Sequence, residues 1–211
     1  DIARQVRESR DWFGCCVDLD RSAVDTRSNA AETRRWVHER GRSDVGCTII
    51  GNGPELANLQ ALARALNVAD SIEFTGYLTG QPLLAHLSAI DVGVIPDPPN
   101  VYNDKISMNK VFEYMSLGIP FVQFDVAEGR TEAGDAALIV PVDDPAAMGD
   151  AILTLMDSPE RRTAMSASGI ARATAEFRWE VAQRALLEAY DAAVPAPASL
   201  PSARRQEDAA T

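Results

Sequence analysis

The feature that most constrains the fold is a regular alternation of short apolar runs and amphipathic segments between Val45 and about Ala192. We predict strands at the apolar runs, residues 46–50, 72–78, 91–96, 120–125 and 136–140. Segments with apolar residues three and four positions apart predict helices over 54–68, 81–90, 107–118, 144–156, 158–177 and 179–192. This alternation predicts an α/β fold, a Rossmann-like parallel sheet flanked by helices.

Charge and composition exclude several classes of function. The 211 residues carry 20 Lys and Arg against 31 Asp and Glu, a net charge of −11. An acidic chain lacks the basic footprint that nucleic-acid binding needs, although one helix N-terminus and a few cations still suffice for a small phosphorylated ligand. No apolar run approaches the roughly 18 residues of a membrane-spanning helix. Three cysteines without metal-ligand spacing indicate no metal site and a reducing, cytoplasmic location.

The sequence divides into three parts. Residues 1–35 show neither strand alternation nor a helical stripe, and we leave them unassigned. They are either a surface arm, part of a neighbouring domain, or a non-native stretch such as the product of a shifted reading frame. Residues 36–193 form the predicted domain, and residues 194–211, rich in Pro, Ala and Ser, are predicted to be a disordered tail.

Polar and glycine-rich junctions follow three of the predicted strands. The first holds Gly51, Asn52 and Gly53, where a helix N-terminus would offer N–H groups to phosphate, although a tight turn needs the same glycines. The second precedes and enters the helix at 107–118, for which Ser107 is the expected N-cap. The third, residues 124–137, is expected to be a polar loop. Candidate ligand-binding residues at the last two junctions are Asp104, Lys105, Ser107, Asn109, Lys110, Glu113, Glu128, Gly129 and Arg130, with Glu132 and Asp135 in the same loop.

Both later junctions also have a plainer interpretation. Lys110 and Glu113 lie three residues apart, as in an ordinary ion pair on a helix surface. The acidic loop after residue 124 could simply be solvated. However, all three junctions follow strands, so a parallel sheet would bring them to one edge, where such folds bind ligands.

Five blocks in succession resemble a known family. They are GNGPELANLQALA, IEFTGYL, AIDVGVIP, KVFEYMSLGIPFVQFD and AALIVPVDDPAAMGDAI. Together, over residues 36 to about 192, they resemble the C-terminal, donor-binding domain of family 4 glycosyltransferases, in the branch that builds bacterial surface polysaccharides. The resemblance implies retaining enzymes of the two-domain GT-B fold, which use a nucleotide-sugar donor as substrate and need no cofactor or metal.

The resemblance also assigns roles to residues. The second glutamate of the family's E-x7-E pair, which contacts the ribose, falls on Glu113, and the first, which contacts the sugar, falls on Lys105. Asp104 or Lys105 would therefore take over the sugar contact, with the 128–130 segment nearby. Gly51 and Gly53 match the family's glycines, and Tyr77 lies where the family brackets the nucleobase. No catalytic residue is assigned.

Other parts of the family pattern do not appear in the sequence. The first strand of the domain and its diphosphate-clamping Arg/Lys pair would fall within residues 1–35, so we expect that strand to be lost and the sheet edge exposed. The acceptor domain is expected as a missing half or a separate subunit, and it would supply any peripheral contact with the inner face of the cell membrane. Without these parts, this chain alone is expected to bind the donor weakly and to be a partial or inactive enzyme.

Two rival functions remain open at this stage. One is a non-catalytic remnant or interaction module that keeps the fold. The other is a sugar-nucleotide epimerase, which would need a histidine in the cleft, whereas His38 and His86 lie on helical stretches and are predicted to be structural.

Overall fold

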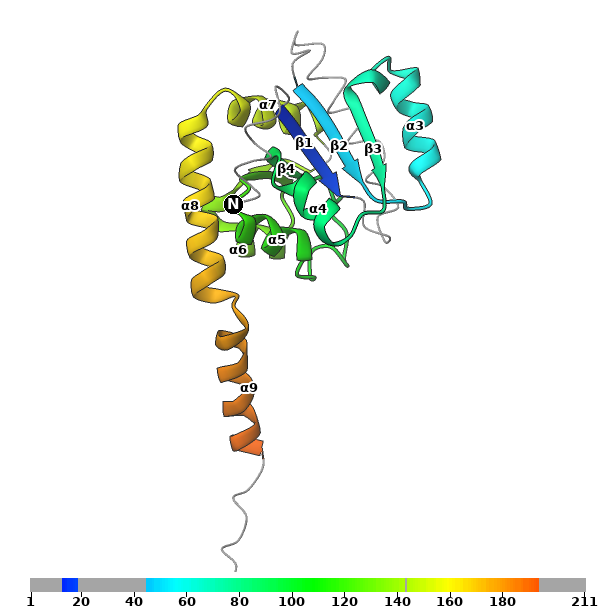
Figure 1. Ribbon diagram of the computed structural model, residues 1–211. Helices are drawn as coiled ribbons and strands as arrows, with labels where there is room; N and C mark the ends of the chain where they lie inside the picture. Colours follow the sequence, from blue (N-terminus) through cyan, green and yellow to red (C-terminus); the bar gives the residue numbers. More distant parts are fainter. Residues whose placement is uncertain (1–12, 19–44, 143, 194–211) are drawn as a thin grey trace, which may run out of the picture.

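A computed structural model of the chain describes residues 13–18, 45–142 and 144–193 (Figure 1). The predicted disordered tail, most of the unassigned N-terminal stretch and His38 lie outside these residues. Within them, the architecture is the predicted one, a parallel sheet with helices on both faces.

The sheet has six strands in the order β3-β2-β1-β4-β5-β6, and every neighbouring pair is parallel. The strands are β1 (Phe13–Asp18), β2 (Val45–Ile50), β3 (Ile72–Gly76), β4 (Ile90–Ile95), β5 (Phe121–Phe124) and β6 (Ala137–Val140). The five strands expected from the apolar runs are therefore confirmed.

The sixth strand corrects the sequence analysis. β1 lies inside the stretch for which no strand was predicted, and it pairs with β2 on one side and β4 on the other. Cys15 is the register partner of both Cys47 and Val92. The first strand of the domain is therefore present in the interior of the sheet, and the expectation that its loss exposes an edge is wrong.

Helices cover both faces of this sheet (Figure 1). Their bounds are α3 (Leu56–Ala65), α4 (Gly80–Leu87), α5 (Asn109–Leu117), α6 (Ala127–Ala133), α7 (Pro145–Met156), α8 (Pro159–Glu176) and α9 (Trp179–Ala193), with short 3-10 helices at Ala69–Ser71 and Gly134–Ala136. One core cluster joins β-strand residues to α3 and α7, and a second joins them to α4, α5 and α6. Helix α8 contributes Met165 to the first cluster and Ala173 to the second. The two clusters make a three-layer domain.

Successive residues of β4 and β5 point to opposite layers, as strand geometry requires. Val92 and Val94 belong to the first cluster, whereas the intervening Gly93 faces α5. A Cβ atom at position 93 would lie only 2.7 Å from the Tyr114 ring, so this glycine lets α5 pack closely on the sheet.

Local sequence signals explain where several helices begin and end. Asp144 accepts a hydrogen bond from the Ala147 N–H at 2.8 Å and caps α7, and Ser158 caps α8 at 3.4 Å. Gly118 ends α5 with a left-handed φ of 67°. The prediction that Ser107 is the N-cap of α5 is wrong. Met108 takes the N-cap position, and its side chain makes no capping hydrogen bond.

The expected polar loop over 124–137 is also corrected. It contains α6 and the 3-10 helix Gly134–Ala136. The side chain of Arg172, from α8, donates to the carbonyls of Glu132 at 2.8 Å and Thr131 at 2.9 Å. These tertiary hydrogen bonds satisfy carbonyls in the last turn of α6, a short helix that its polar sequence alone does not predict.

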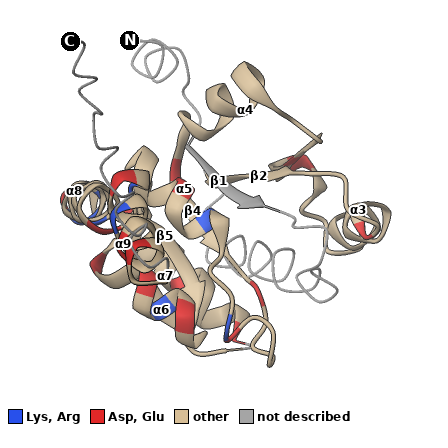
Figure 2. Cartoon of the chain, turned by 90° about the horizontal axis from the view of Figure 1, so that it is seen from below, with Lys and Arg blue, Asp and Glu red and all other residues tan. Residues whose placement is uncertain are grey.

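Because all six strands are parallel, their carboxyl ends lie at one edge of the sheet, the side seen in Figure 2. The strand order reverses between β1 and β4, which are neighbours in the sheet although β2 and β3 come between them in sequence. In doubly wound folds, ligands bind outside the carboxyl ends of the strands at this switch point. The fold thus indicates where to search for a site.

Helix α9 is the most exposed of the described helices: none of its residues is buried, and all but Val181 are exposed. It continues beyond α8 and projects away from the sheet layers (Figure 1). Trp179, Leu186, Leu187 and Tyr190 are all exposed along it. This leaves an amphipathic helix whose apolar side chains contact little of the described domain.

Candidate functional site

The predicted site residues fall into two groups at the carboxyl edge of the sheet. The first group follows β2 and β3. The Gly51 N–H donates to the Gly76 carbonyl at 2.9 Å, which ties the turn after β2 to the end of β3. Gly51 has a φ of 139°, a conformation that favours glycine, while Asn52 and Tyr77 are exposed. A Cβ atom on Gly53 would meet no atom within 4 Å, so a ligand can approach this turn.

The second group surrounds the beginning of α5, and its centre is a buried ion pair. The Nζ atom of Lys110 lies 2.7 Å from Oδ2 of Asp97, the second residue after the end of β4. Both side chains are more than nine-tenths buried. Lys110 is therefore not part of a surface pair with Glu113, and its charge is largely taken up by Asp97.

Glu132 of α6 reaches the same region. Its carboxyl group accepts hydrogen bonds from the Ser107 hydroxyl and the Met108 N–H, so a carboxylate from another helix occupies the N-terminus of α5. Burial raises the pKa of the Glu132 carboxyl, the Ser107 bond lowers it, the negative charge of Glu128 raises it, and the Met108 bond lowers it, with a net upward shift. Its Oε2 atom is buried and has no hydrogen-bond partner among the described residues.

One further contact joins the loop after β4 to α6, and a second lies within the segment that follows β5. Oδ1 of Asp104 accepts a hydrogen bond from the Ala127 N–H at 3.4 Å, at the first residue of α6. Within the α6 segment, Nε of Arg130 lies 2.8 Å from Oδ1 of Asp125. Of the candidate cations at this edge, Lys110 and Arg130 are thus paired with carboxylates, and Lys105 is exposed.

The remaining predicted residues differ in their access to a ligand. Asn109, Glu113 and Glu128 are exposed, and Glu113 lies in the second turn of α5. Gly129 is instead buried. A Cβ atom at this position would lie only 3.2 Å from the amide nitrogen of Gln123 in β5. Gly129 therefore serves close packing between α6 and the sheet.

The structure joins the loop after β4 to α5 and α6 in the second group and Gly51 to β3 in the first. Among the described residues, no hydrogen bond or ion pair joins a predicted site residue of one group to one of the other. β1 lies between the two groups in the sheet. Residues 19–44, which follow β1 in the sequence, are not among the residues that the structure describes. Sequence analysis missed Asp97 as a site residue and listed Glu132 without a role. The signal for Asp97 was its place directly after a strand, between prolines, but its pairing with a lysine 13 residues later emerges only in three dimensions.

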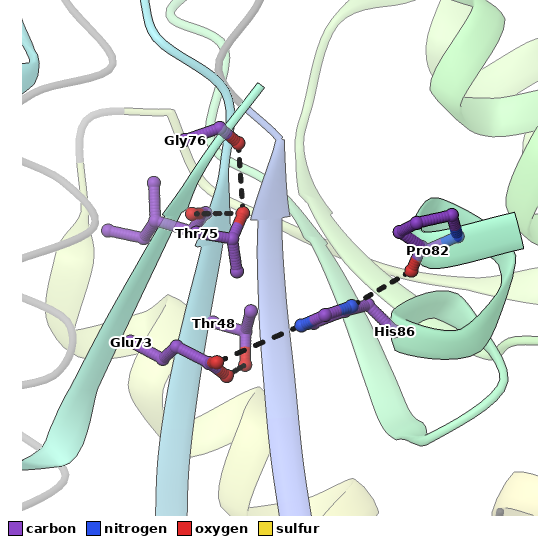
Figure 3. A network of polar contacts seen from close by, with 7 residues as sticks. Thr48, Glu73, Thr75, Gly76, Pro82 and His86 are labelled. Carbon is purple, nitrogen blue, oxygen red and sulfur yellow. Dashed lines mark hydrogen bonds and ion pairs between the residues drawn. The ribbon is translucent and has the colours of Figure 1, made fainter. Parts of the chain in front are cut away.

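His86 lies away from this edge. Its Nδ1 is 2.9 Å from the Pro82 carbonyl, one turn back in α4, and its Nε2 is 3.7 Å from Glu73. Figure 3 shows these contacts, with the Thr48 hydroxyl donating to the same carboxylate at 3.4 Å. Glu73 is the second residue of β3, so the histidine lies towards the amino end of the strand. This placement agrees with a structural role.

The described residues contain no group of three or more His, Cys, Asp and Glu side chains arranged to hold a metal ion. In the same part of the chain, no helix is both long and apolar enough to span a bilayer.

Comparisons with known proteins point in one direction. A family model described as group 1 glycosyl transferases matches residues 22–158, more than half of the chain. The chain is 32% identical over 162 residues to the lipopolysaccharide core biosynthesis mannosyltransferase LpsB of Rhizobium meliloti, covering 71% of this chain and 43% of that protein. It is 30% identical over 136 residues to the GDP-mannose-dependent alpha-(1-6)-phosphatidylinositol monomannoside mannosyltransferase of Mycobacterium tuberculosis, covering 63% and 35%.

Among solved structures, the C-terminal domain of the group 1 glycosyl transferase LpcC from Francisella tularensis matches with a TM-score of 0.64 at 11% identity, covering 84% of this chain and 93% of that domain. At this identity the likeness shows a shared fold, that of one half of a GT-B glycosyltransferase. The chain spans less than half the length of the curated relatives it matches.

Proposed function

Because the chain belongs to the group 1 glycosyltransferases, we propose that it is the donor-binding half of a retaining glycosyltransferase. In this proposal the donor is a nucleotide-sugar and the acceptor is a polysaccharide or a lipid-linked sugar. The nucleotide-sugar is a substrate, and the proposal includes no cofactor.

The observation that carries the proposal is the gathering of ligand-binding groups at one edge of the sheet. An open glycine turn and the exposed Tyr77 follow β2 and β3. On the other side of the switch point, the exposed carboxylate of Glu113 stands on α5. A carboxylate can accept two hydrogen bonds from vicinal ribose hydroxyls, and backbone N–H groups at a glycine turn suit a diphosphate.

The proposed reaction breaks the bond between the anomeric carbon and the donor phosphate and forms a bond from that carbon to an acceptor oxygen. The nucleoside diphosphate leaves with the electron pair, the acceptor hydroxyl loses its proton, and the anomeric configuration is kept. This chain's contribution is to bind and orient the donor, which removes translational freedom from the reacting centre.

The ion pair at Lys110 limits how the diphosphate can be held. A lysine whose ammonium lies 2.7 Å from Asp97 cannot present its full charge to a phosphate. Lys110 would instead fix the beginning of α5 relative to β4. Because the Glu132 carboxylate occupies the N-terminus of α5, the diphosphate would instead be held by backbone N–H groups of the glycine turn at 51–53 and by the exposed Lys105.

The acceptor half would meet the chain at α9. That helix exposes Trp179, Leu186, Leu187 and Tyr190, and the relatives are more than twice as long as the segment matched here. An unburied apolar helix face is costly in water unless another surface covers it. We propose that the acceptor half covers this face in the assembled enzyme, either as the same chain or as a subunit.

A thermal-shift screen tests donor binding. The purified chain is melted with UDP-, GDP- and dTDP-sugars, and glucose 6-phosphate serves as the control. A ligand that binds only the native state raises the melting temperature by mass action. A shift with one nucleotide class supports the proposal, and a cooperative melt that no nucleotide-sugar shifts would favour a non-catalytic remnant instead.

Substitution of Glu113 then tests the site itself. Glu113→Ala is expected to weaken nucleotide-sugar binding by roughly 1–3 kcal/mol, the cost of leaving polar partners unpaired. Isothermal titration calorimetry measures the change. Glu188→Ala, which removes an exposed glutamate of α9, is the matched control and should bind like the unmodified chain. Unchanged affinity in Glu113→Ala would remove this residue from the site.

A further inference from the structure

The loop after β4 presents two apolar side chains to solvent beside the proposed site. Val101 is 78% exposed and Tyr102 is 62% exposed, at the outer part of a loop that runs from Pro96 to Ser107. Exposed residues of this size cost little singly, but a pair of them on an ordered loop next to a site indicates a contact surface.

Hydrogen bonds within the loop hold this pair in a fixed position. Oδ1 of Asn100 accepts from the N–H groups of Tyr102 at 2.9 Å and Asn103 at 2.8 Å. The Asn100 carbonyl accepts from the Asp104 N–H at 2.9 Å, and the side-chain amide of Asn103 donates to the Pro98 carbonyl at 2.7 Å. Asparagine side chains that bond the backbone two and three residues ahead fix a turn.

Contacts at both ends anchor the loop to the domain. At its start, Asp97 is bound to the buried Lys110 of α5. Near its end, Asp104 contacts the first N–H of α6. Because the loop is already ordered, a ligand that meets Tyr102 would lose little free energy to fixing the loop, which favours binding.

The position of the loop relates it to the donor. β4 is one of the two strands at the switch point, so the loop that follows borders the crevice where ligands bind in this fold. The Tyr102 carbonyl also accepts a hydrogen bond from the Lys105 N–H at 3.0 Å. The aromatic residue and Lys105, the exposed cation of the proposed site, thus share one turn.

We propose that Tyr102, with Val101 beside it, is a platform for the sugar ring of the donor. The inference rests on the proposed function and adds a specificity-determining residue to it. A pyranose ring has an apolar C–H face and a polar hydroxyl edge. The Tyr102 ring would contact the C–H face, and Asp104 and Lys105, which follow it closely in sequence, would meet the hydroxyl groups. Two apolar side chains match one such ring, whereas a stable protein interface needs about 800 Å² from each partner.

The test compares nucleotide with nucleotide-sugar. Calorimetry on the full chain measures the dissociation constants of UDP, UDP-glucose, GDP and GDP-mannose for the unmodified protein, Tyr102→Ala and Tyr102→Phe. Tyr102→Ala keeps the carbonyl that Lys105 uses, so the turn is retained. Tyr190→Ala, which removes an exposed tyrosine of α9, is the matched control.

Tyr102→Ala is expected to weaken binding of the nucleotide-sugar by roughly 3- to 10-fold, the usual size of an aromatic contact, and to leave the free nucleotide unchanged. Tyr102→Phe and Tyr190→Ala should match the unmodified chain. Equal affinities for nucleotide-sugar in Tyr102→Ala and the unmodified chain, or an equal loss for nucleotide and nucleotide-sugar, would overturn the platform alone. If the unmodified chain binds none of the four compounds and no nucleotide-sugar shifts its melting temperature, the proposed function fails and the inference fails with it.

Discussion

At the scale of single residues, the buried pair of Asp97 and Lys110 links the end of β4 to the first turn of α5. Two charges in so dry a place lose most of their hydration, and each is tolerated because the other lies 2.7 Å away. A pair of this kind fixes the geometry of the proposed site more than it adds to stability.

Removing one partner of this pair should show that each buried charge needs the other. Asp97→Asn or Lys110→Met is expected to lower the free energy of unfolding by about 3–5 kcal/mol, because a buried charge remains without its partner. The double variant should lose clearly less than the sum of the two single losses. Urea denaturation measures all three, and strictly additive losses would mean that the two charges do not stabilise one another.

Glu132, at the same site, makes the free energy of unfolding depend on pH. Its pKa in the folded chain is raised above the ordinary value of 4.5, mainly by burial. The folded state therefore binds this proton more tightly than the unfolded state. The stabilisation is complete below pH 4.5 and is lost as the pH rises through the folded pKa.

The variant Glu132→Gln removes this titration while keeping an acceptor for the Met108 N–H. Relative to the unmodified chain, its free energy of unfolding should rise as the pH increases above 4.5 and then level off. Urea denaturation at a series of pH values gives the difference, and Glu180→Gln on exposed α9 controls for the loss of a surface glutamate. A difference that does not vary with pH would contradict the raised pKa.

At the scale of elements, the sequence predicts whatever is encoded locally. Helices α7 and α8 begin where Asp144-Pro145 and Ser158-Pro159 place a capping side chain before a proline. Gly118 ends α5 for an equally local reason, its left-handed φ. Such elements need no knowledge of distant residues.

Elements that depend on distant partners were missed. β1, FGCCVD, is a short apolar run among polar residues, and only its pairing with β2 and β4 marks it as a strand. α6 is polar and contains a glycine, and Arg172 from α8 bonds its last carbonyls. The same limit applies to the proposed site: Glu113 follows from a motif, whereas the contact between Glu132 and the N-terminus of α5 spans 24 residues of sequence and needs the fold.

At the scale of the whole molecule, two kinds of apolar surface can be told apart. The sheet and its covering helices enclose side chains such as Leu155 of α7, which is fully buried. Helix α9 carries Leu186 and Leu187 at 47% and 55% exposure. If the acceptor half covers α9, as proposed, these leucines contribute to assembly and hardly to the stability of this domain.

Substitutions in the two places should therefore differ. Leu186→Glu and Leu187→Glu are expected to change the free energy of unfolding of the chain by no more than about 0.5 kcal/mol, because exposed positions have little packing to lose. Leu155→Ala, the buried counterpart, should lose about 2–5 kcal/mol through lost burial and a cavity. Urea denaturation of the three variants decides the matter. A loss in the α9 variants as large as that in Leu155→Ala would mean that α9 packs against its own domain in solution, and its apolar face would then not be available to an acceptor half.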